Sequence, residues 1–78
     1  MKFNYRRLKA ERIAKGFTGD YVAEQMGISK SYYSKKENAK SPLDVDEFAE
    51  ILTILGVSNS ELHIFFTNNV STMETNEF

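Results

Sequence analysis

Lysine and serine side chains are concentrated in one short stretch of this chain. Lys30, Ser31, Ser34 and Lys35 fall within six consecutive residues. A lysine ammonium can donate hydrogen bonds to guanine O6 and N7, and a serine hydroxyl can pair with several base edges. Residues at this spacing share one side of a helix. The stretch therefore raises the question of a nucleic-acid contact.

Other site chemistries find little support. His63 is the only histidine, and there is no cysteine to join it in a metal site or to form a disulfide framework. No motif assembles a nucleophile, a base and an oxyanion donor from the serines, threonines and this histidine. We expect no metal, no cofactor and no enzymatic activity.

Charge is strongly segregated along the chain, although the formal net charge is only −1. Residues 1–40 hold all ten basic residues and four acidic ones, a net charge of +6, whereas residues 41–78 hold seven acidic residues and no basic one. Clustered Lys and Arg favour a polyanion whatever the total charge. Charge blocks also arise by chance on helical surfaces, so the spacing of other residues must decide.

Length and turn signals indicate the elements that would hold these residues. Seventy-eight residues suffice for one domain with a single modest core. The start is no secretory signal and no apolar stretch is long enough to span a bilayer, so we expect a cytoplasmic protein. Capping residues and glycines predict five helical segments, over about 4–15, 18–26, 30–37, 44–55 and 58–66, followed by a polar tail at 67–78.

Apolar spacing predicts which side chains face inward. The expected inward residues are Tyr5, Leu8 and Ile13 in the first helix, Val22, Ala23 and Met26 in the second, Tyr33 in the third, and Phe48, Ile51, Leu52 and Leu55 in the fourth. Asp44 with Glu47 has the form of a capping box, and Ser58 with Glu61 repeats it. Only about three residues join the second and third helices, which forces a steep crossing. The third helix has one clear inward residue, so most of its surface is left for something other than the core.

The stretch 18–37 closely resembles the helix-turn-helix of the phage repressor and Cro family, also called the lambda-repressor-like or XRE family. The residues that carry the resemblance are Ala23, Gly27, Ile28, Ser29, Tyr33 and Glu37. It extends over about residues 5–66. It implies an all-α, five-helix DNA-binding domain over 1–66, with a flexible tail at 67–78 that is disordered or serves as a dimer arm.

The resemblance also implies roles for individual residues. Matching positions supply base contacts from Lys30, Ser31, Ser34 and Lys35, which favours G·C pairs. Phosphate contacts would come from Thr18, Gly19 and Asp20 at one end of the motif, and from Asn38, Lys40 and Ser41 at the other. Arg12 and Glu37 match an ion pair that joins the first helix to the end of the third.

Three positions depart from the family pattern. Gly19 stands where glutamine is usual, so a side-chain contact with phosphate is missing and only backbone donors remain. Lys36 stands where an apolar residue is usual, and we expect it to extend outward or to add a DNA contact. Ala39 replaces a usual glycine, and we expect any left-handed turn to move to Asn38.

These observations predict a sequence-specific transcriptional regulator of phage or prophage type that reads operator double-stranded DNA as a homodimer. Leu62, Phe65 and Phe66 are the expected dimer surface, with one phenylalanine facing inward. An alternative keeps the fold but uses the acidic C-terminal half to bind a protein partner, as an antitoxin or antirepressor does. The sequence leaves the choice between these functions open.

Overall fold

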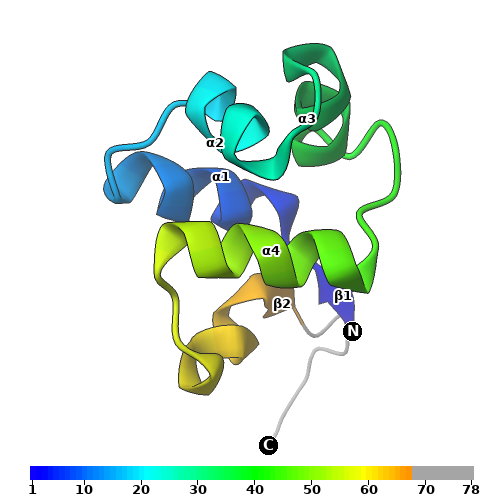
Figure 1. Ribbon diagram of the computed structural model, residues 1–78. Helices are drawn as coiled ribbons and strands as arrows, with labels where there is room; N and C mark the ends of the chain where they lie inside the picture. The colour runs from blue at the N-terminus through cyan, green and yellow to red at the C-terminus, as the bar shows by residue number, and fades with distance from the viewer. Residues whose placement is uncertain (68–78) are drawn as a thin grey trace, which may run out of the picture.

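The computed structural model describes residues 1–67, and these form four α-helices, one 3₁₀-helix and a small two-stranded sheet (Figure 1). Most of the predicted tail, residues 68–78, lies outside the described residues. The all-α, five-helix fold class is confirmed, with the fifth helix of the 3₁₀ type. The elements are β1 (Lys2–Phe3), α1 (Tyr5–Ala14), α2 (Gly19–Met26), α3 (Lys30–Glu37), α4 (Val45–Leu55), η1 (Asn59–Phe65) and β2 (Phe66–Thr67).

Each α-helix begins at a side chain that caps its first turn. Asn4, Thr18, Ser29 and Asp44 each accept a hydrogen bond from the backbone N–H three residues later. Glu47 returns a bond to the Asp44 N–H, which completes the predicted capping box. Because a cap satisfies donors that the helix itself leaves free, these residues fix where the helices start.

The last helical segment differs from the prediction. Ser58 makes no capping bond, and its hydroxyl instead pairs with that of Ser60 at 2.8 Å. The segment is a 3₁₀-helix that leads directly into β2. β2 pairs antiparallel with β1, Lys2 opposite Thr67 and Phe3 opposite Phe66. This ladder, which the sequence did not predict, brings the start of the chain beside Thr67.

The core lies between α1, α2, α4 and η1. Its fully buried side chains include Leu8, Val22, Ile51 and Phe65. On α1 the inward position expected for Ile13 belongs to Arg12, which is buried, while Ile13 is 57% exposed. The prediction for Ile13 is wrong because Arg12 follows Leu8 by one helical turn and shares its face.

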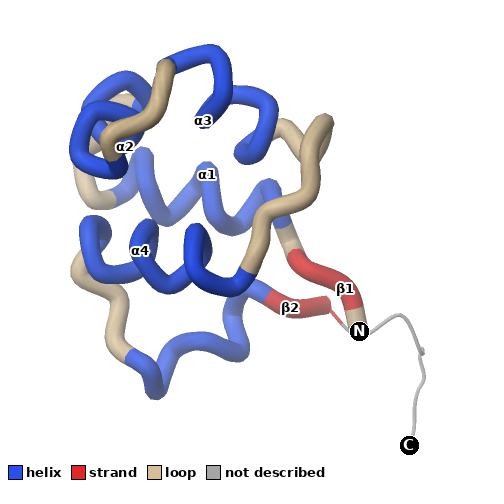
Figure 2. The backbone as a smooth tube through the Cα atoms, turned by 45° about the vertical axis from the view of Figure 1, so that its right-hand side comes forward, coloured by secondary structure: helices blue, strands red, loops and turns tan. Residues whose placement is uncertain are grey.

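The helices stack so that one end of the molecule carries α2 and α3. Figures 1 and 2 show α2 and α3 above the layer of α1 and α4, with η1 and the sheet at the opposite end. The α2–α3 pair thus lies at one end of the domain, where α2 packs against α4 and α3 against α1. Among residues 1–67, no helix has the length and apolarity that crossing a membrane requires.

Candidate nucleic-acid interface

A three-residue turn, Gly27–Ser29, joins α2 to α3 and sets their crossing. Gly27 has φ of 73°, a left-handed conformation that other residues adopt only at an energetic cost. The Ile28 N–H donates to the Ala23 carbonyl, and the Ile28 side chain packs against the core. Ala23 is fully buried. These contacts leave the turn little freedom, so α3 is held at a fixed angle to α2.

α3 turns most of its surface to solvent. Of its eight residues only Tyr33, Lys36 and Glu37 are buried. The four predicted base-contacting residues are all exposed and lie on this free surface: Lys30, Ser31, Ser34 and Lys35. Nothing in residues 1–67 covers them. Their spacing places two lysines and two serines where a DNA groove could meet them.

A buried hydrogen-bonded network holds the far end of α3 against α1. The Arg12 guanidinium donates from Nε to Glu37 Oε2 at 2.8 Å and from Nη2 to Glu37 Oε1 at 3.0 Å. Tyr33 donates its hydroxyl to the same carboxylate at 2.7 Å, and Arg12 Nη1 donates to the Phe17 carbonyl at 2.6 Å. Arg12 is 8% exposed and Glu37 7%. The predicted partners Arg12 and Glu37 thus form a two-point ion pair inside the domain.

The network keeps its charges. Burial alone would raise the pKa of Glu37, but the hydrogen bonds from Arg12 and Tyr33 outweigh it and lower that pKa. The hydrogen bond from Arg12 to Glu37 likewise raises the pKa of the guanidinium. Burial raises the pKa of Tyr33, and the hydrogen bond to the Glu37 carboxylate raises it further. All three guanidinium nitrogens of Arg12 donate to acceptors inside the domain, and two of them fix Glu37 at the end of α3.

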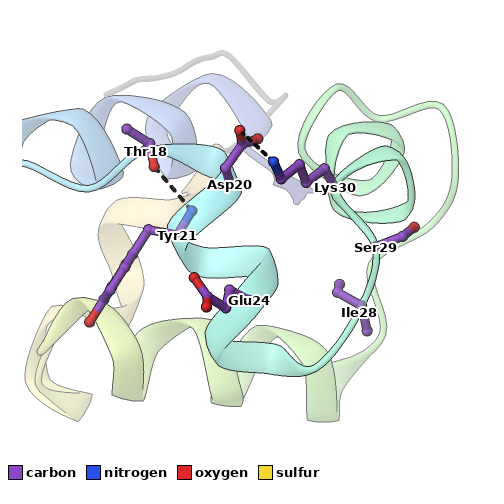
Figure 3. Close-up of a pocket in the computed structure, with 7 residues that line it drawn as sticks. All are labelled: Thr18, Asp20, Tyr21, Glu24, Ile28, Ser29 and Lys30. Carbon is purple, nitrogen blue, oxygen red and sulfur yellow. Dashed lines mark hydrogen bonds and ion pairs between the residues drawn. The ribbon is translucent and has the colours of Figure 1, made fainter.

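The beginning of α2 forms the first predicted phosphate-contacting region. Thr18 accepts the Tyr21 N–H at 3.0 Å, and the N–H groups of Gly19 and Asp20 lie in the first turn, where no helix carbonyl reaches them. The Asp20 carboxylate, in the first turn of α2, lies 3.4 Å from the ammonium of Lys30, the first residue of α3 (Figure 3). Both side chains are largely exposed. This exposed ion pair joins the first turns of α2 and α3.

The residues after α3 form the second predicted phosphate-contacting region, and the left-handed turn is at Ala39, with φ of 62°. The expectation of a left-handed Asn38 is wrong, since Asn38 has φ of −91° and its side-chain amide donates to the Ser34 carbonyl. The Ala39 N–H donates to the Lys36 carbonyl and the Lys40 N–H to the Lys35 carbonyl. These two bonds define a Schellman motif, whose geometry assigns the left-handed position to the residue after the cap.

Lys36 neither extends outward nor faces DNA, which corrects the prediction. It is 8% exposed, its ammonium lies 3.0 Å from Glu47, and it donates to the Pro42 carbonyl at 2.5 Å. The ammonium also lies 5.0 Å from the centre of the Tyr32 ring, and the Tyr32 hydroxyl donates to Glu47. Lys36 therefore joins α3 to the first turn of α4, and the end of α3 is firmly packed.

The residues predicted for a dimer surface do not lie together on the outside. Phe65 is fully buried, in edge contact with Phe48, and its assignment to a dimer surface is wrong. It is the last residue of the 3₁₀-helix and faces the core. Leu62 is half-buried and Phe66 is 40% exposed. Val45, which no sequence pattern indicated, is 80% exposed.

Comparison with known proteins agrees with this geometry. A family model described as Helix-turn-helix matches residues 8–62. The match includes α1 through α4, except for the first three residues of α1, and extends into the first four residues of η1. Neither the curated proteins nor the solved structures gave a match.

Proposed function

The chain belongs to the Cro- and cI-like helix-turn-helix family, and from this we propose that it is a cytoplasmic transcriptional regulator that reads operator DNA as a homodimer. Its helix-turn-helix domain is a DNA-binding domain by family. The proposal adds that binding is sequence-specific, that two copies act together and that the regulator is of phage or prophage type.

The exposed face of α3 is the observation that carries the proposal. In this family the second helix of the motif enters the major groove, with its first residues at the base edges. Lys30 and Ser31 are the first two residues of α3, and Ser34 and Lys35 follow one turn later. All four are exposed. We assign base contacts to these residues, with the lysines favouring guanine.

Phosphate contacts on both sides would set the register of α3 in the groove. The free N–H groups at Gly19 and Asp20, with Thr18, suit one strand, because a helix N-terminus attracts an anion. Asn38, Lys40 and Ser41 suit the other, and Lys40 is exposed directly after the Schellman turn. On binding, Lys30 would exchange its exposed contact with Asp20 for a base edge.

A homodimer follows from the size of the recognition surface. One α3 covers only a few base pairs, whereas two copies related by a two-fold axis read two half-sites one helical turn apart. Exposed apolar side chains outside α3 support such an assembly, namely Val45 and Phe66, with half-buried Leu62 nearby on η1. An interface there leaves the face of α3 free.

Selection of bound duplexes from a random pool tests the proposal. We expect enrichment of a short palindrome, with guanines in each half-site, at moderate salt. The variant Lys30→Gln/Lys35→Gln should lose the enrichment but remain folded, because both side chains are exposed. Wild-type protein that enriches no sequence would refute the proposal.

A protein-binding role, as in an antitoxin or antirepressor, has one specific observation in its favour. Val45 is 80% exposed between Asp44 and Asp46, an apolar side chain in acidic surroundings that would suit a basic partner. Co-purification of a stoichiometric protein, together with weak and unspecific DNA binding, would favour this role over the operator-binding one.

A further inference from the structure

A groove on the side of the domain concentrates positive charge outside the helix-turn-helix. It lies between β1, the first half of α1 and the residues that follow α3. Its charged lining residues are Lys2, Arg6, Lys9 and Glu37. We call it the basic groove.

The cations of the basic groove are not used within the domain. None of the ion pairs among residues 1–67 involves Lys2, Arg6 or Lys9, and all three side chains are exposed. The Glu37 carboxylate acts on Lys9 through space, but its charge is already paired with the Arg12 guanidinium, and its oxygens accept hydrogen bonds from Arg12 and Tyr33. The groove therefore carries a net positive charge.

The position of these cations does not stabilise α1. Arg6 lies in the first turn of α1, at the positive end of the helix dipole, where acidic residues are favourable and basic ones are not. α2 and α4 follow the favourable pattern, with Asp20 in one first turn and Asp46 and Glu47 in the other. Arg6 and Lys9 are also one turn apart on the same helix face, where like charges repel. Within α1 itself, the positions of Arg6 and Lys9 are therefore electrostatically unfavourable.

The basic groove adjoins the second phosphate-contacting region. Asn38 and Ala39, which directly follow α3, form part of its wall. A DNA strand that meets Asn38 and Lys40 and continues past the end of α3 would next meet Arg6 and Lys9. We propose that the basic groove binds the phosphate backbone of DNA flanking the base pairs that α3 contacts. This inference rests on the proposed operator binding and adds contacts to DNA phosphates outside the half-site.

The proposal predicts that binding depends on the length of the duplex. Two duplexes would be compared, one ending at the selected palindrome and one extended by about six base pairs on each side, or ~20 Å of helix. The wild-type chain should bind the longer duplex more tightly, with a steeper dependence on salt. In Arg6→Gln/Lys9→Gln the gain from the longer duplex should disappear. On that duplex the slope of log affinity against log salt should fall by about 0.9 for each lost phosphate contact, about 1.8 in all.

Arg7→Gln is the matched control. Arg7 is adjacent to Arg6 in α1 and has the same charge, but it lies outside the groove and pairs with Glu11. Its loss should leave the gain from the longer duplex intact. Far-UV circular dichroism and thermal unfolding would check that the exposed substitutions leave the fold unchanged.

The possible results separate the two proposals. If the wild-type chain binds both duplexes equally, or if Arg7→Gln loses as much of the gain as Arg6→Gln/Lys9→Gln, the basic groove does not bind flanking DNA, although operator binding stands. If the wild-type chain binds neither duplex, operator binding itself fails and the groove proposal fails with it.

Discussion

Replacing Glu37 by glutamine tests whether the buried network fixes α3. The substitution keeps the size and shape of the side chain but removes its charge. It leaves the Arg12 guanidinium, 8% exposed, beside a neutral amide that cannot accept from Nε and Nη2 at both positions. Tyr33 also loses the carboxylate that accepts its hydroxyl at 2.7 Å.

The expected loss is large for a domain of this size. Removing one partner of a buried ion pair costs about 3–5 kcal/mol, because the other charge stays buried and uncompensated. Arg12 keeps its bond to the Phe17 carbonyl and the amide can still accept one bond, so the lower end applies, about 3 kcal/mol. Domains of this kind have about 5–15 kcal/mol of stability in total. Glu37→Gln should therefore fold, with its midpoint at a clearly lower urea concentration.

The pH dependence gives an independent readout. The pKa of Glu37 is lowered in the folded domain, so the folded state favours the ionised carboxylate. A group of this kind contributes its stability above its unfolded pKa of about 4.3, and the contribution is lost as pH falls through the folded pKa. The difference in unfolding free energy between wild type and Glu37→Gln should therefore be full at pH 7 and shrink as the solution becomes more acidic than about pH 4.

Urea unfolding followed by circular dichroism, at several pH values, measures both effects. Arg12→Met/Glu37→Leu serves as the matched control, since replacing both partners by apolar groups costs far less than removing one. A loss below about 1 kcal/mol for Glu37→Gln at pH 7, the value of an exposed ion pair, would refute the argument. So would a loss that does not change with pH.

Three further predictions concern single positions of the interface. Ala39→Gly should stabilise the domain by about 1 kcal/mol in thermal or urea unfolding, because a φ of 62° strains a residue that has a Cβ. An unchanged or lower stability would contradict the left-handed turn. Gly19→Gln should tighten operator binding relative to Gly19→Ala, because the glutamine amide adds a donor for phosphate. The site has room for a side chain, since the nearest atom to a new Cβ is Tyr33 Cε2 at 3.6 Å, an ordinary contact. Equal affinity of the two variants in a gel shift would count against a phosphate at this helix end. Lys35→Ala should relax the base preference at one position of the half-site, whereas Lys40→Ala should weaken binding to all duplexes alike and lower the slope of log affinity against log salt by about one. The reverse pattern in a binding selection would overturn the assignment of the two lysines.

Local signals were enough to predict the four α-helices and the turn between α2 and α3. Thr18, Ser29 and Asp44 cap their helices through side chains that reach the backbone only three residues away, so sequence spacing alone identifies them. Gly27 adopts the left-handed conformation that its lack of a side chain permits. The exposed lysines and serines of α3 follow from a helix with one inward aromatic residue, Tyr33. None of these features needs a partner from another element.

Positions that depend on a distant partner were predicted poorly. Lys36 is buried because Glu47, eleven positions along the chain, offers a carboxylate and the Tyr32 ring covers its ammonium. Ile13 faces solvent because Arg12 takes the inward place to reach Glu37. An amphipathic pattern predicts that apolar residues are buried at such positions and charged ones exposed. A charged side chain can nevertheless be buried where its hydrogen-bond partners are all present.

Spacing along the chain is enough to predict the four α-helices and the basic residues that share a face of α3, because these features depend on contacts within one or two turns. The burial of Phe65, the pairing of β1 with β2 and the groove that brings Lys2, Arg6 and Lys9 opposite the end of α3 are visible only in the folded domain. Those outcomes depend on residues far apart in the chain, whose meeting is set by packing of whole helices and leaves no periodic signal in the sequence.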